Sequence, residues 1–177
     1  MGMTAPSGHI YVTGEVVTAA TLNTYVEANL DYALTSAPYA HVYNSAAISI
    51  PNNASTALTF DSERDDKGNC HSTSSNTGRL VGVDGGRYDG WVGIAFAANA
   101  TGVRQGTVRI NGATVIAEVC VASAGGANVT ELVIPWKYRL AASDYVEVLA
   151  YQNSGGALNV SKLGNSSPEF EFSWKRS

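Results

Sequence analysis

The stretch that decides the fold is RYDGWVGIAFAANATGVRQGTVRINGATVIAEV, residues 87–119. Its first ten residues alternate as a strand does, and five of them fall on one face: Tyr88, Gly90, Val92, Ile94 and Phe96. Residues 107–119 form two alternating runs around Asn111-Gly112, the pair that a type I′ turn prefers. The stretch therefore predicts a strand followed by a β-hairpin.

The same alternation extends in both directions from this hairpin. The strand expected at residues 55–63 places Leu58 and Phe60 inward, and a polar loop is expected at residues 61–78. The 18 glycines and the many β-branched residues suit strands joined by tight turns. Further strands are expected at residues 41–50, 55–63, 129–136, 144–152, 156–163 and 169–174. The sequence predicts an all-β sandwich or jelly roll.

The N-terminal segment has a different pattern. Residues 1–14 lack periodicity and are expected to form an extended arm that is ordered only against a partner. A short α-helix is expected from its N-cap Thr18, and it should end before Pro38. Its apolar stripe consists of Leu22, Val26, Leu30 and Leu34 at four-residue spacing.

This periodicity change places the domain boundary between an N-terminal segment, residues 1–37, and a β domain, residues 38–177. The stripe needs a cover, and two alternatives stay open. The helix packs on its own β domain, or three copies of the helix pack together or dock on a partner protein.

Charge and composition exclude several functions. The formal net charge is −4, which gives no basic surface for nucleic acid. The N-terminus resembles no signal peptide and no run of apolar residues suits membrane insertion, so synthesis in a cytoplasm is expected. No nucleophile and base can be paired from motifs, which argues against an enzyme, and no cofactor is expected.

Cysteines, histidines and acidic residues give weak metal signals. Cys120 lies in an apolar run and is expected in the core, whereas Cys70 is undetermined. His9, His41 and His71 do not have the spacing of zinc ligands. The densest acidic run is expected to be a solvated loop partly balanced by Arg64 and Lys67, with a hard-cation site as the alternative. The candidate ligands of that site are Asp61, Glu63, Asp65 and Asp66.

Three segments carry a resemblance: HVYNSAAISIPNNASTALTFDSERDD (41–66), TGRLVGVDGGRYDGWVGIAFAANATGVRQGTVRINGATVIAEV (77–119) and LAASDYVEVLAYQNSGGALNV (140–160). Together they resemble a C1q/TNF-like jelly-roll domain of bacteriophage structural proteins, over about residues 40–174. One departure is Ser143, where many such domains carry Gly before the Asp. Residues 6–34, PSGHIYVTGEVVTAATLNTYVEANLDYAL, resemble the leader of phage head and tail appendage proteins.

This resemblance implies a ten-stranded jelly roll that assembles as a homotrimer. It further implies a non-enzymatic virion protein made in the host bacterial cytoplasm: a head decoration, a short head fibre or a minor tail protein, bound to capsid or tail proteins. The expected attachment residues are Ile10, Val12, Val17, Leu22, Val26 and Leu30. The trimer candidates are Tyr145, Tyr151, Phe170, Phe172 and Trp174, each with burial in the core as the alternative.

A receptor-binding module for host-surface glycan is the alternative function. Aromatic rings stack on sugar rings, and four aromatic residues are candidates for such contacts: Tyr11, Trp91, Trp136 and Tyr138. Trp91 is expected on the strand face opposite Val92 and Ile94.

Overall fold

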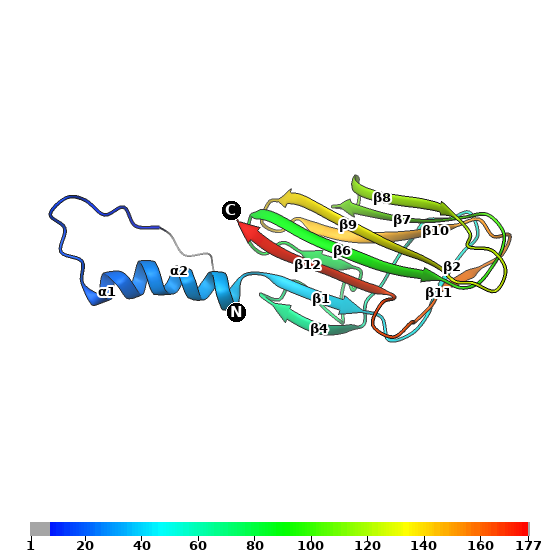
Figure 1. Ribbon diagram of the computed structural model, residues 1–177, viewed down its shortest axis with the longest axis horizontal. Helices are drawn as coiled ribbons and strands as arrows, with labels where there is room; N and C mark the ends of the chain where they lie inside the picture. Colours follow the sequence, from blue (N-terminus) through cyan, green and yellow to red (C-terminus); the bar gives the residue numbers. More distant parts are fainter. Residues whose placement is uncertain (1–7, 177) are drawn as a thin grey trace.

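The computed structural model describes residues 8–176, which form an N-terminal arm, one helix and a β-sandwich (Figure 1). The helix begins after the N-cap Thr18, whose hydroxyl accepts a 3.1 Å hydrogen bond from the Thr21 amide, and it ends before Pro38, as predicted. Its successive parts are α1 (Ala19–Leu22), η1 (Asn23–Glu27), α2 (Ala28–Asp31) and η2 (Tyr32–Ser36). The η parts are wider π-helical turns, in which the Ala28 amide donates to the Asn23 carbonyl.

The described residues contain twelve strands. They are β1 (Tyr39–Tyr43), β2 (Ile48–Ile50), β3 (Thr56–Ala57), β4 (Ser62–Lys67), β5 (Arg79–Val81), β6 (Gly86–Phe96), β7 (Val103–Ile110), β8 (Thr114–Ala122), β9 (Thr130–Leu140), β10 (Tyr145–Gln152), β11 (Leu158–Val160) and β12 (Glu169–Arg176). The resemblance implied ten strands. The difference reflects four very short strands, β2, β3, β5 and β11, of two or three residues each.

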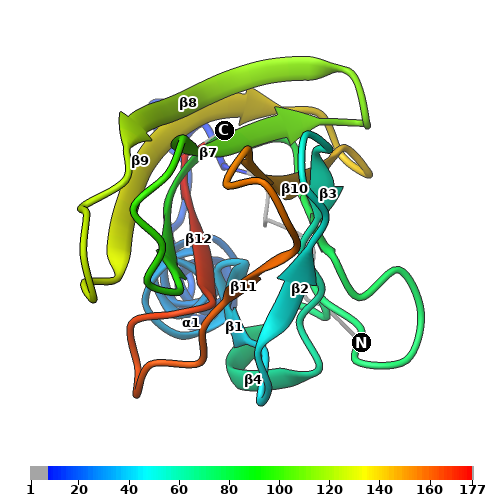
Figure 2. The ribbon, with the colours of Figure 1, turned by 90° about the vertical axis from the view of Figure 1, so that its right-hand side faces the viewer.

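The strands form two antiparallel sheets. Sheet A has the order β2-β11-β6-β12-β1-β4. The seventh strand, β9, lies off this path and pairs with β6 over its whole length. Sheet B has the order β3-β10-β7-β8, and β5 also pairs with β10. Viewed end-on, the sheets lie one over the other with loops at the end away from the helix (Figure 2). The predicted all-β sandwich is confirmed.

The core lies between the sheets and follows the predicted alternation. Tyr88, Val92 and Phe96 of β6 are fully buried, and Phe170 and Phe172 of β12 lie beside them. Gly90 permits a close approach, because a Cβ there would lie 2.6 Å from the Trp136 ring. Leu58 and Phe60 are also fully buried, as expected from their positions in the sequence.

The predicted hairpin joins β7 to β8. Asn111 and Gly112 both have positive φ, 51° and 73°, as the central residues of a type I′ turn require, and the Ala113 amide closes the turn on Ile110. The turn before β10 is less favourable. Ser143 occupies the position where similar domains carry Gly, and its φ of 74° lies in the left-handed region that costs energy for any residue with a Cβ.

Two early predictions need correction. The expected strand at residues 41–50 is split into β1 and β2, because the Asn44 side chain binds the Ala46 amide and the Thr59 carbonyl instead of continuing the strand. The expected polar loop at residues 61–78 begins with β4. This strand pairs with β1 at the edge of sheet A, where charged side chains are exposed to solvent at little cost.

Candidate interaction surfaces

The apolar stripe of the N-terminal helix is exposed. Leu22, Val26, Leu30 and Leu34 are 45%, 50%, 57% and 73% exposed, so the β-sandwich of the same chain does not cover them. The helix extends from the end of the sandwich where β12 finishes, roughly along the long axis of the molecule (Figure 1). Among the expected attachment residues of the arm, Ile10, Val12 and Val17 are exposed as well. The stripe therefore lacks a cover within the described part of the chain.

One side chain fixes the helix to the sandwich. Tyr32 is 3% exposed and is the single buried residue of the described helix. Its hydroxyl donates a hydrogen bond to Asp84, and its ring contacts the edge of Trp174 with centroids 5.6 Å apart. Burial, followed by the hydrogen bond to Asp84, raises the pKa of Tyr32 above its ordinary range. The neutral phenol therefore holds the helix in a defined direction.

The arm covers a different side of the helix. The His9 ring stacks on Tyr25 with centroids 4.5 Å apart, and its Nε2 lies 2.7 Å from the Glu15 carboxylate. Glu15 also accepts from the Val12 amide, and these hydrogen bonds lower the pKa of its carboxyl group. The arm thus packs along the row that contains Tyr25 and leaves the stripe open.

The charges of the chain are unevenly distributed. All eleven Lys and Arg residues lie in residues 64–176, so residues 1–37 contain none. Those 37 residues contain Glu15, Glu27 and Asp31 and therefore carry −3 of the formal net charge of −4. Glu27 and Asp31 line a shallow groove of about 420 Å³ together with Leu30 and Leu34. The apolar stripe is thus bordered by carboxylates.

The outward face of sheet A forms a second candidate surface, the sheet A face, defined by Tyr39, His41, Trp91, Val133, Pro135 and Glu171. Val133 is 66% exposed, and Trp91 is half-buried against His41, with ring centroids 5.7 Å apart. Burial, together with the neighbouring Glu171 carboxylate, raises the pKa of Tyr39 to about 12. This face combines aromatic, apolar and charged groups.

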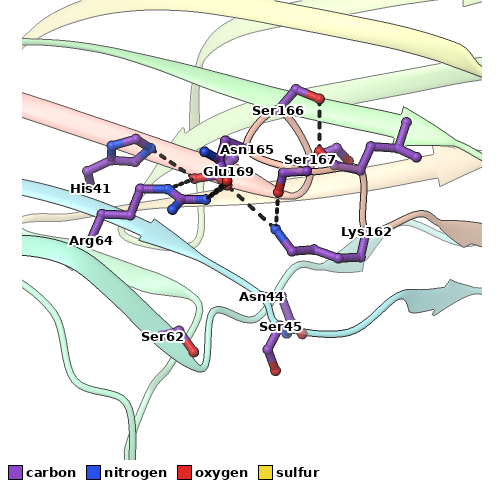
Figure 3. A network of polar contacts seen from close by, with 12 residues as sticks. His41, Asn44, Ser45, Ser62, Arg64, Lys162, Asn165, Ser166, Ser167 and Glu169 are labelled. Atoms are coloured by element: carbon purple, nitrogen blue, oxygen red, sulfur yellow. Dashed lines mark hydrogen bonds and ion pairs between the residues drawn. The ribbon is translucent and has the colours of Figure 1, made fainter.

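A buried carboxylate lies at one border of the sheet A face (Figure 3). Glu169 is fully buried and accepts hydrogen bonds from Arg64, whose Nε lies 3.0 Å from Glu169 Oε2. Lys162 Nζ lies 3.8 Å from the same carboxylate, and His41 Nε2 lies 2.9 Å away without hydrogen-bond geometry. Arg64 also lies over the Tyr43 ring. The cluster ties β1, β4 and β12 to the loop before β12.

Arg64 was expected to balance the neighbouring acidic run, and that prediction is wrong, because it pairs with Glu169 instead. The metal candidates also have separate partners. Asp61 accepts from Ser45, and Asp66 accepts from the Cys70 and His71 amides. Burial raises the pKa of Asp61, but its hydrogen bonds from Ser45 and Ser62 outweigh this and lower it overall.

The remaining acidic candidates do not converge on these two. Glu63 Oε1 lies 2.8 Å from His71 Nδ1, and Asp65 is exposed on β4. Within residues 8–176, no three His, Cys, Asp or Glu side chains are grouped so that they could hold a metal ion. One cysteine differs from expectation as well, and the burial of the other, which the sequence left undetermined, is now given by the structure. Cys70 is buried, whereas Cys120, expected in the core, is exposed on the edge strand β8.

The aromatic trimer candidates do not share a surface. Phe170 and Phe172 are fully buried within one chain, so the core alternative holds for both. Trp174 is half-buried at the helix junction, and Tyr145 and Tyr151 are half-buried on β10 of sheet B. Of the glycan candidates, Trp136 is 5% exposed and belongs to the core, Trp91 is half-buried on the sheet A face, and Tyr11 and Tyr138 are exposed.

Sequence reasoning missed two features of these surfaces. Each His contacts a Glu: His9 with Glu15, His41 with Glu169 and His71 with Glu63. The pairs formed by His41 and Arg64 with Glu169 join distant parts of the sequence, and no local spacing could have revealed them.

In the described part of the chain, no helix has the length and apolar character needed to cross a membrane.

The two sheets, their strand order and their connections define a TNF-like jelly roll. The crystal structure of murine APRIL at pH 5.0 matches with a TM-score of 0.61 and 11% sequence identity, covering 79% of this chain and 100% of that chain. The structure of Eiger TNF from S. frugiperda gives a TM-score of 0.61 at 11% identity, covering 80% and 94%, and murine APRIL at pH 8.0 gives 0.58 at 12%, covering 78% and 98%.

No family model and no curated protein matches the sequence. At identities of 11–12%, the structural likeness establishes the fold. The C1q/TNF-like jelly roll expected from the sequence is therefore confirmed as a fold.

Proposed function

We propose that this chain is a non-enzymatic structural protein of a bacteriophage particle, a homotrimer attached to capsid or tail proteins by its N-terminal segment. The observation that carries the proposal is the exposed apolar stripe on a helix that Tyr32 fixes to the end of the sandwich. Exposed apolar stripes of this kind are typical of helices that bind a partner. On the particle, the trimer would serve as a head decoration, a short head fibre or a minor tail protein.

Two features support the homotrimer. The fold is TNF-like, and the family resemblance of the sequence implies a homotrimer for this fold. The sheet A face also presents Trp91, Val133 and Pro135 at the surface of one chain. The edge of the sandwich beside this face carries a further exposed apolar side chain, Val115 of β8. Two different surfaces that complement each other form a heterologous contact, and such contacts close into a ring when the rotation permits.

The phage assignment is supported by the resemblance of residues 6–34 to the leader of phage appendage proteins, followed directly by one jelly-roll domain. The location in a virion follows from that assignment. A non-enzymatic role is consistent with the partners of two acidic side chains on these surfaces. Glu169 is bound by Arg64, and Asp61 by Ser45.

Deletion of residues 1–36 tests the attachment role. We expect the shortened chain to stay folded and trimeric by light scattering but to be missing from purified particles. Retention of the shortened chain on the particle, at the level of the full chain, would exclude the N-terminal segment as the attachment.

Substitution on the sheet A face tests the trimer. Light scattering of the full chain should give three times the chain mass of 18.5 kDa. Val133→Asp is expected to give a folded monomer, because an uncompensated charge in an apolar interface is costly. Tyr151, a trimer candidate from the sequence, lies on the other sheet, so Tyr151→Asp should remain trimeric if the sheet A face forms the interface. A monomeric full chain, or a trimer unaffected by Val133→Asp, would refute this assembly.

Glycan binding is the second candidate function. It is favoured by the exposed ring of Tyr138 on β9, which lies outside the sheet A face, because exposed aromatic rings stack on sugar rings. A host-glycan array separates the two functions. Saturable binding that Tyr138→Ala abolishes would support a receptor-binding module, and absence of binding to every host glycan would count against it.

A further inference from the structure

We propose that the exposed stripe of the N-terminal helix docks a segment of a partner protein that presents an apolar row flanked by Lys or Arg. This inference rests on the proposed attachment role and specifies the chemistry of the partner. It follows from the arrangement of side chains around the helix, from the charge of the segment and from the fixed direction that Tyr32 gives it.

Residues four positions apart lie one above the other on the helix and form rows along it. The row with Tyr25 is covered by the arm through His9, and the row with Tyr32 faces the sandwich. The apolar stripe lies opposite the Tyr32 row, on the side that neither the arm nor the sandwich covers. A partner can therefore approach the stripe without displacing either contact.

The row beside the stripe supplies the charge. Glu27 and Asp31 are one turn apart and line the same groove as Leu30 and Leu34. The segment has no Lys or Arg with which these carboxylates could pair internally. Apolar contacts in the groove would provide most of the affinity, and opposite charges at its rim would steer the approach and fix the register.

A second copy of the same helix is the competing occupant. Side-by-side packing of copies would bring acidic rows together, with no basic residue on any copy to compensate. Like charges placed side by side are unfavourable at helix surfaces. A basic partner replaces this repulsion with attraction, so the charge pattern favours the basic partner.

The test uses the full chain and a synthetic peptide of about 18 residues, long enough to form a helix when bound. The peptide has Leu at every fourth position and Lys in the flanking rows, and its control has Glu in place of Lys. Fluorescence anisotropy should show saturable binding of the Lys peptide, weakened by added salt, and at least about tenfold weaker binding of the Glu peptide.

Two double variants locate the site. Glu27→Lys with Asp31→Lys should weaken binding of the Lys peptide about tenfold or more, because both rim attractions become repulsions. Asp65→Lys with Glu131→Lys changes the net charge equally at exposed positions on β4 and β9 and should leave binding within about twofold of the parent chain. Leu30→Ser should weaken binding at any salt concentration, since the apolar contact is lost.

Equal binding of both peptides, or unchanged binding by the Glu27 and Asp31 double variant, would overturn the proposal. Stronger self-association of that double variant, with neither peptide bound, would assign the stripe to a second copy instead. These outcomes are separate from the attachment role. Loss of the shortened chain from particles would support attachment whatever the peptides do, and its retention would refute attachment while leaving the peptide result intact.

Discussion

Replacement of Tyr32 by Ala should release the N-terminal helix while leaving the β-sandwich folded. The Tyr32 ring contacts Trp174, and its hydroxyl binds the Asp84 carboxylate. No other side chain of the described helix is buried, so the contact between helix and sandwich depends on this one residue. A helix of this length is marginal in water without such a contact.

The magnitude follows from the two contacts that are lost. Removal of a buried aromatic ring costs about 3–5 kcal/mol, and loss of a hydrogen bond to a charged group costs about 1.5–3 kcal/mol. Tyr32→Phe keeps the ring and loses the second contact alone. We therefore expect the docking equilibrium to shift by about three to six powers of ten in Tyr32→Ala, and by about one to two in Tyr32→Phe.

Hydrogen–deuterium exchange measures both parts of the molecule at once. In Tyr32→Ala, amides of residues 28–36 should exchange about a hundredfold faster or more, and amides of β6 and β12 should keep their protection. Urea denaturation of the sandwich should be nearly unchanged. An equal loss of protection in β6 would refute the reasoning, since it would make the helix part of the core of the sandwich. Unchanged exchange in the helix would also refute it.

Three further predictions follow from single residues. Ser143→Gly should stabilise the chain by up to about 1 kcal/mol in urea denaturation, because Gly relieves the positive φ of the turn. A thiol reagent at pH 8 should modify Cys120 rapidly, whereas Cys70 should react only after unfolding, because burial raises its pKa to about 12. Arg64→Met should destabilise the sandwich by about 3 kcal/mol by leaving Glu169 buried without its main partner, and Glu169→Gln in the same chain should recover part of that loss.

Local patterns in the sequence were sufficient for much of the fold. Alternation identified the inward positions of β6, and Asn111-Gly112 identified the hairpin turn, because both signals depend on neighbouring residues. The prediction failed for Cys120. An apolar run is typical of a strand covered on both faces, but β8 is the edge strand of sheet B and buries none of its residues fully.

The candidate surfaces were less predictable. Glu169 alternates with the inward-facing Phe170 and Phe172 and so occupies an outward position on its strand, but it is buried, and its partner Arg64 is 105 residues away in the sequence. The run of charges in β4 was assigned to a loop, because pairing with β1 is a tertiary contact without a local signal. The exposed stripe was visible as a pattern, but the side of the helix that stays uncovered depends on where Tyr32 and His9 are bound.

The π-helical turns connect this stripe with its proposed role. In a regular α-helix of 3.6 residues per turn, a row with four-residue spacing rotates by about 40° at each step, or about 120° from Leu22 to Leu34. The wider turns η1 and η2 contain more residues each, which reduces this rotation and keeps the row closer to one side of the helix. A straight row suits a partner that packs along the helix over about 18 Å without winding around it. Tyr32 lies in η2 and binds the sandwich from the side opposite the stripe, so a partner that packs along the row would not meet the β-sandwich.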